Sequence, residues 1–140
     1  MNQDEKGLLR MKIWTFLDDS NLIRGSWSTK GRIPNFQGAS EAALNLRRTE
    51  EWKKSRTIFC SPDSAQKEVR EYALLDGKTL IMASPQLKRG YLILEPDSIR
   101  GQEKLASTIK GAFTFGETIL EFPTVDLVVE GSVAVDKNGN

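Results

Sequence analysis

The stretch that decides the fold is residues 56–84, RTIFCSPDSAQKEVREYALLDGKTLIMAS. It begins with the β-branched and aromatic run 57–60, which is typical of a strand buried on both faces. Residues 65–75 then place their apolar side chains on one helical stripe, and Gly77 ends the helix. The apolar run 79–82 predicts a second buried strand. Two such strands joined by a helix predict a right-handed βαβ unit and a parallel sheet.

This unit also predicts where a ligand would bind. In open α/β sheets, ligands bind at the carboxyl ends of strands and at the amino ends of the helices that follow. In this sequence those places are residues 61–66 and 83–87. Pro62 ends the first strand because it has no N–H to donate, and Asp63 and Ser64 can cap the helix.

Composition limits the class of protein. The 140 residues predict a single domain, and 20 basic against 19 acidic residues leave a net charge of +1. This balance gives no electrostatic reason to expect a nucleic acid or an anionic membrane as partner. The first ten residues are polar, unlike a signal peptide, and one cysteine indicates a reducing compartment. We therefore expect a cytoplasmic protein, whose oligomeric state the sequence leaves open.

The residue types that are missing limit the chemistry. The sequence contains no histidine, which excludes histidine acid–base catalysis and His-containing zinc sites. The single cysteine, Cys60, lies inside an apolar run and is expected to pack rather than react. Phosphoryl transfer suits the remaining residue types because it depends mainly on positioning and charge neutralisation. No catalytic residue and no metal-ligating residue can be named from these patterns.

Two basic residues near the N-terminus lie four apart on a predicted helix. Residues 4–19 have helical spacing, and their apolar stripe consists of Leu9, Ile13, Phe16 and Leu17. Lys6 and Arg10 share one face of this helix. They form either a solvated basic edge or a pair of cations directed at phosphate groups.

Residues 20–37 are predicted to be a loop that carries the aromatic side chains Trp27 and Phe36. These either pack onto the domain or form the wall of a ligand site. The rest of the chain predicts helices at 39–48, 50–54 and 102–111 and strands at 91–94, 118–121 and 125–136. Asn138-Gly139 after the last strand predicts a hairpin turn, so we expect the sequence to be cut inside a structural unit.

Several stretches together resemble the 5-formyltetrahydrofolate cyclo-ligase (methenyltetrahydrofolate synthetase) family. The sequence is most similar to the divergent branch found in archaea and in methenyltetrahydrofolate synthase domain-containing proteins. The matching stretches, in family order, are Lys6-x-x-Leu9-Arg10, GRIPNFQGA at 31–39, PDSAQKEVRE at 62–71, GKTLIMASPQL at 77–87 and VDLVVEGSVAVDKNG at 125–139.

The resemblance implies an α/β fold of the NagB/RpiA-like (Rossmann-like) three-layer type, with a parallel or mostly parallel sheet flanked by helices and incomplete at the C-terminus. It also implies a reaction, in which ATP phosphorylates the formyl oxygen of 5-formyltetrahydrofolate. Ring closure and loss of phosphate then give 5,10-methenyltetrahydrofolate, with Mg²⁺ assisting as part of the ATP complex.

The resemblance also implies roles for individual residues. Those implied to bind ATP phosphates are Lys6, Arg10, Ser84 and Gln86. Those implied to bind the folate are Phe36, Pro62, Asp63, Gln66 and Arg70. Gln86 differs from the family, which carries a cation at that position.

Family members continue beyond the Asn-Gly turn into a Gly-rich segment whose backbone amides hold ATP phosphates. Because that segment is not among these 140 residues, we expect this chain by itself to show no turnover. The alternative function is a non-catalytic protein of the same fold that binds a folate or a nucleotide. A sugar-phosphate isomerase-like activity is allowed by the fold alone and has no motif in its favour.

Overall fold

The computed structural model describes residues 1–25 and 28–140, so Trp27 lies outside the described residues. The helices are α1 (Gln3–Asp19), α2 (Ala39–Arg47), α3 (Glu50–Lys54), α4 (Lys67–Leu75), α5 (Glu103–Ala106) and α6 (Ile109–Phe115). The strands are β1 (Thr57–Cys60), β2 (Thr79–Ala83), β3 (Tyr91–Leu94), β4 (Glu117–Ile119) and β5 (Leu127–Val129). Short 3₁₀ turns cover Ser64–Gln66, Pro85–Leu87 and Pro96–Ser98.

The five strands form one sheet in the order β4-β3-β2-β1-β5. β1 pairs in parallel with both β2 and β5, which confirms the βαβ unit predicted from residues 56–84. β3 runs antiparallel to β2, and β4 runs antiparallel to β3, so β3 alone has the opposite direction. The predicted α/β fold with a mostly parallel sheet flanked by helices is therefore confirmed.

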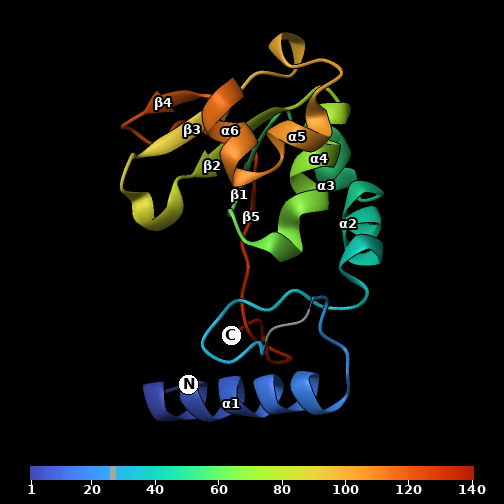
Figure 1. Cartoon of the computed structure of the whole chain (residues 1–140), viewed down its shortest axis with the longest axis vertical. Coiled ribbons are helices and arrows are strands. Elements are labelled where there is room, and N and C mark those ends of the chain that lie inside the picture. The colour runs from blue at the N-terminus through green and yellow to red at the C-terminus, as the bar shows by residue number, and fades with distance from the viewer. Residues whose placement is uncertain (26–27) are drawn as a thin grey trace.

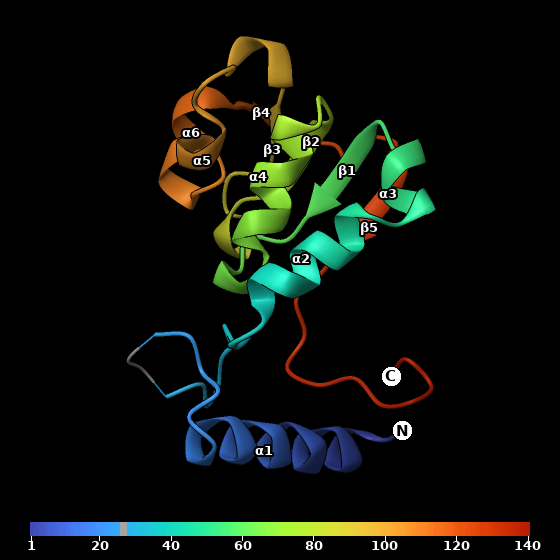
Figure 2. The same ribbon diagram turned by 90° about the vertical axis from the view of Figure 1, so that its right-hand side faces the viewer.

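The core lies between one face of the sheet and three helices. Figures 1 and 2 show α4, α5 and α6 on the same face. On that face the side chains of Ile58, Leu80 and Leu94 are completely buried. They pack with Val69 and Ala73 of α4 and with small residues of α5 and α6. On the opposite face, rings of Phe59, Tyr91 and Phe122 meet edge to face at centroid distances of 5.1–6.5 Å.

Helix α1 lies apart from this core, beyond the carboxyl ends of β1 and β5 (Figures 1 and 2). It begins with a capping box, in which the Asn2 side chain accepts from the Glu5 backbone and the Glu5 side chain accepts from the Asn2 backbone. None of its residues is buried. Phe16, one of the four residues of its apolar stripe, is 55% exposed. Membrane crossing would need a longer or more apolar helix than any among the described residues.

Two predicted elements differ from the structure. The helix expected over 102–111 is two short helices, because the Thr108 hydroxyl accepts the Gly111 amide and begins α6. The strand expected over 125–136 keeps only β5, after which 130–140 is coil. The turn predicted at Asn138-Gly139 is present, with the Gly139 amide donating to the Asp136 carbonyl over 3.0 Å.

Candidate functional site

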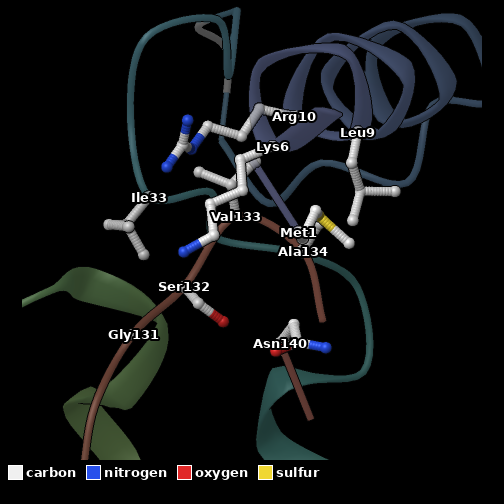
Figure 3. Close-up of a pocket in the computed structure, with 10 residues that line it drawn as sticks. All are labelled: Met1, Lys6, Leu9, Arg10, Ile33, Gly131, Ser132, Val133, Ala134 and Asn140. Carbon is white, nitrogen blue, oxygen red and sulfur yellow. The ribbon is translucent and has the colours of Figure 1, made fainter. Parts of the chain in front are cut away.

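A cavity of about 300 Å³ lies where α1 meets the coil that follows β5. Lys6, Leu9 and Arg10 line it from α1, and Ile33 lines it from the loop 20–37. The coil 131–134 forms the opposite wall. Figure 3 shows the Lys6 side chain reaching toward Ser132, with the Arg10 side chain leaving α1 on the same side. Two cations and a stretch of backbone therefore surround one space.

Hydrogen bonds to the loop 20–37 hold α1 in this position. Trp14 donates its Nε1–H to the Arg32 carbonyl over 2.9 Å. The Asp18 carboxylate accepts from the Ser28 hydroxyl at 2.7 Å and from the Thr29 backbone N–H at 3.1 Å. These hydrogen bonds, with that from Ser28 the strongest, lower the pKa of Asp18. The end of α1 thus stays charged and tied to the loop at neutral pH.

The carboxyl ends of β1 and β5 are joined through Ser61. Its backbone N–H donates to the Val129 carbonyl, and its hydroxyl accepts the Gly131 N–H, both over 3.0 Å. Gly131 therefore leaves the ladder and bonds to the residue that follows β1. This turns the chain away from the sheet and toward α1, which explains why β5 is so short.

Gly131 lies between the residues that follow β1 and the loop 20–37. A methyl group built on it would collide with the Asp63 carboxylate, and would lie 2.8 Å from Ile33 Cγ2 and 2.9 Å from Gln66 Oε1. Asp63 and Gln66 thus reach Gly131, which itself lines the cavity with Lys6 and Arg10, and Ile33 belongs to both surroundings. A larger residue at this place would displace the side chains of Asp63, Gln66 and Ile33.

A profile of the 5-formyltetrahydrofolate cyclo-ligase family matches residues 2–140. The chain belongs to this family. Three similar curated proteins are each named methenyltetrahydrofolate synthase domain-containing protein. The one from Bos taurus is 35% identical over 94% of this chain, that from Danio rerio 33% over 99%, and that from Mus musculus 32% over 96%. The chain spans only 36–38% of their lengths. No solved structure matches it.

Within this family member, the residues predicted to bind phosphate fall in two places. Lys6 and Arg10 line the cavity beside Gly131. Ser84 and Gln86 lie instead in the link between β2 and β3. Ser84 is 2% exposed, and its hydroxyl donates to the Gly90 carbonyl at 2.7 Å and accepts from the Arg89 N–H at 3.1 Å. The structure therefore does not bring Ser84 and Gln86 together with Lys6 and Arg10.

Arg70, predicted on the folate side, is an internal brace. It is 2% exposed, and its guanidinium donates to the carbonyls of Ser61, Asp63 and Ser107 over 2.7–2.8 Å. Burial lowers its pKa, which remains compatible with a charged guanidinium. Its contacts fix the backbone of 61–63, and so the direction in which Asp63 points.

The other two residues predicted to bind folate do not line the cavity. Pro62 is half-buried between β1 and the following 3₁₀ turn, and Phe36 is half-buried and pairs with Ile23 through an isolated β-bridge. Cys60 is completely buried, and burial raises the pKa of its thiol to about 12, which favours packing over reactivity.

Of the ten residues that line the cavity, only Lys6 and Arg10 were predicted as site residues, and the other eight include Ile33, Gly131 and Ser132. Gly131 was visible as a glycine that interrupts an apolar run, which indicates a bulge or a close approach of backbone. Nothing in the sequence showed that this approach would be to Ser61. Among the described residues, no group of three or more His, Cys, Asp or Glu side chains could hold a metal ion.

Proposed function

We propose that this chain takes part in the ATP-dependent conversion of 5-formyltetrahydrofolate to 5,10-methenyltetrahydrofolate. Family membership supports the class of reaction. The observation that carries the proposal is the place of Gly131, which lines the cavity with Lys6 and Arg10 and is also approached by the side chains of Asp63 and Gln66. Such a site can hold a phosphate donor and a pterin next to each other.

The cations would act on the phosphates. In the proposed reaction the formyl oxygen attacks the γ-phosphorus of ATP, and ADP leaves. N10 then attacks the formyl carbon, and inorganic phosphate leaves as the five-membered ring closes. Lys6 and Arg10 would bind phosphate oxygens and stabilise the negative charge that moves to the leaving ADP. The Ser132 hydroxyl, which faces the same space, would supply a further hydrogen bond.

The residues present offer little to a protein-bound Mg²⁺ ion. The lining of the cavity with Lys6 and Arg10 has no carboxylate side chain, and the nearest carboxylate across Gly131 is that of Asp63. Magnesium in such sites is held largely by substrate phosphates and water. We therefore assign no step of the reaction to protein ligands of the metal.

A second candidate function is binding of folate or nucleotide without catalysis. It is favoured by the link between β2 and β3, since the Ser84 hydroxyl is used within that link and Gln86 supplies no cation. Such a chain would still bind a folate or a nucleotide, but it would lack the groups that drive phosphoryl transfer.

One experiment separates these functions. The purified chain is titrated calorimetrically with ATP and with 5-formyltetrahydrofolate, and is then mixed with both while the absorbance of methenyltetrahydrofolate is followed. Turnover supports the cyclo-ligase reaction. Binding of both ligands without turnover supports the binding function. If neither ligand binds, both candidate functions are wrong.

A further inference from the structure

Ser61 is the residue at which four segments of the chain meet. Its backbone N–H donates to the Val129 carbonyl of β5 over 3.0 Å, and its own carbonyl accepts from the buried Arg70 of α4 at 2.7 Å. Its hydroxyl accepts the Gly131 N–H over 3.0 Å and donates to Gln66 Oε1 over 3.5 Å. Every polar atom of Ser61 therefore has a partner, and the partners come from β5, α4, the coil after β5 and the 3₁₀ turn before α4.

The hydrogen bonds of this hydroxyl have a fixed direction. The backbone N–H of Gly131 can only donate, so Ser61 Oγ accepts there. The one hydrogen of the hydroxyl then goes to Gln66 Oε1, which can only accept. Gly131, Ser61 and Gln66 thus form one chain of hydrogen bonds, and the Nε2 hydrogens of Gln66 are left to a ligand.

One wall of the cavity at Lys6 depends on this hydroxyl. The coil 131–134 forms that wall, and Figure 3 shows it running from Gly131 past Ser132 toward α1. Among the residues that the structure describes, no other hydrogen bond joins 131–135 to the rest of the protein. The hydroxyl is itself held in place, because both backbone groups of Ser61 are bonded to the sheet and to α4. The core thus positions the cavity wall through a single side chain.

The same hydroxyl reaches the residues predicted to bind folate. Asp63 and Gln66 both approach Gly131, and Gln66 is the one whose side chain Ser61 contacts. Hydrogen bonds in a chain position and polarise one another. A ligand that holds the Gln66 side chain in place therefore also favours the position of Gly131 in which its N–H is bonded.

We propose that the Ser61 hydroxyl is a positioning group that couples the binding of ATP to the binding of the reduced folate. This inference rests on the proposed function, because it places one ligand at each end of the chain of hydrogen bonds. A folate held by Gln66 orders the hydroxyl and, through Gly131, the cavity wall that faces Lys6 and Arg10. ATP in that cavity orders the same groups from the other end, so each ligand raises the affinity for the other. Ser61 acts through its two neighbours rather than on the reacting atoms.

The test measures how much one ligand changes the affinity for the other. The affinity for the β,γ-imido analogue of ATP is determined calorimetrically with and without saturating 5-formyltetrahydrofolate. Wild type is compared with Ser61→Ala and with the control Ser98→Ala, which also removes a hydroxyl that donates to a backbone carbonyl, that of Glu95 at 3.0 Å. We expect the enhancement by folate to fall about 3- to 10-fold in Ser61→Ala only. The affinity for each ligand alone should stay within about threefold of wild type.

A double-mutant cycle distinguishes positioning through Gln66 from a general loss of structure. Gln66→Ala should lose the same enhancement, and adding Ser61→Ala to it should lower the enhancement no further. The Gln66→Ala variant also keeps the inference testable if Ser61→Ala does not fold, because an enhancement equal to that of wild type would then overturn it.

The outcomes separate this inference from the proposed function. If both ligands bind to wild type without enhancing each other, the positioning role of Ser61 is wrong and the proposed function stands. The same conclusion holds if the enhancement is equal in wild type and Ser61→Ala, or if the losses in the double-mutant cycle are additive. If neither ligand binds to wild type, the inference and the proposed function are both overturned.

Discussion

The sheet with its packed helices and the separate helix α1 differ in how far their side chains are buried. In the sheet, Leu80, Ile81 and Leu94 have no exposed surface, and the buried Arg70 guanidinium donates to three backbone carbonyls. In α1, a helix of 17 residues, no residue is buried, and Leu8 is 72% exposed. The stability of the protein therefore comes mainly from the sheet and the helices packed on it. The proposed ligand chemistry lies where α1 meets the coil that follows β5.

The largest expected effect on the free energy of unfolding comes from removing the buried guanidinium of Arg70. Arg70→Met leaves the carbonyls of Ser61, Asp63 and Ser107 without their donor. Because each unsatisfied buried acceptor is costly, we expect a loss of about 3–5 kcal/mol in the free energy of unfolding, measured by urea denaturation. Arg48→Met, at an exposed arginine, is the control and should lie within about 0.5 kcal/mol of wild type. Equal losses in both variants would mean that the guanidinium contacts do not stabilise the fold.

A matched pair of leucine truncations compares the layers directly. Leu80→Ala opens a cavity in the core and should cost about 2–5 kcal/mol, whereas Leu8→Ala on α1 should cost less than about 0.5 kcal/mol. Both are measured from thermal and urea unfolding. A large loss of stability for Leu8→Ala would show that the exposed face of α1 is covered in solution. The proposed difference between α1 and the sheet would then be wrong.

A smaller effect is expected at the amino ends of the strands. Asp76 accepts hydrogen bonds from Arg47 and from Trp52 Nε1, the latter at 2.9 Å. Burial opposes ionisation, but these hydrogen bonds lower the pKa of Asp76 below its ordinary 3.8. Because the folded-state pKa is depressed, the stabilisation is complete above the unfolded pKa and is lost as the pH falls through the folded value.

The Asp76→Asn variant tests whether the ionised carboxylate of Asp76 stabilises the fold. We expect it to be less stable than wild type by about 1–2 kcal/mol at neutral pH, with the difference narrowing between about pH 5 and pH 3. Asp97→Asn is the control, since that side chain is 90% exposed. A difference that stays constant over this pH range would rule out the ionised carboxylate as the cause.

The sequence predicted the βαβ unit because local apolar runs decide it. β1, α4 and β2 need only buried strands, an apolar helical stripe and a glycine stop, and all of these are visible in residues 56–84. The helix cap predicted from Asp63 or Ser64 is wrong, because neither the 3₁₀ turn nor α4 begins with a side-chain hydrogen bond to its backbone. The reversed direction of β3 could also have been foreseen. The link between β2 and β3 is too short for a crossover, which needs a dozen or more residues.

The contacts of the candidate site were harder to predict because they join residues far apart in the chain. Gly131 meets Ser61 across 70 positions, and no local pattern specifies that contact. Arg70 was predicted to line the folate side with Asp63, and its side chain instead donates to backbone carbonyls, including that of Asp63. Spacing showed that Lys6 and Arg10 share a face of α1, whereas only the tertiary structure shows that this face meets the coil 131–134.

The central claim is that phosphates bind between α1 and the coil after β5. The most direct measurement is the affinity for ATP of wild type, of Lys6→Gln/Arg10→Gln and of the control Lys12→Gln/Arg48→Gln, which removes two exposed cations outside the cavity. We expect at least about a tenfold loss of affinity in the first variant, with unchanged unfolding, and little change in the control. Equal affinity in all three proteins would contradict it.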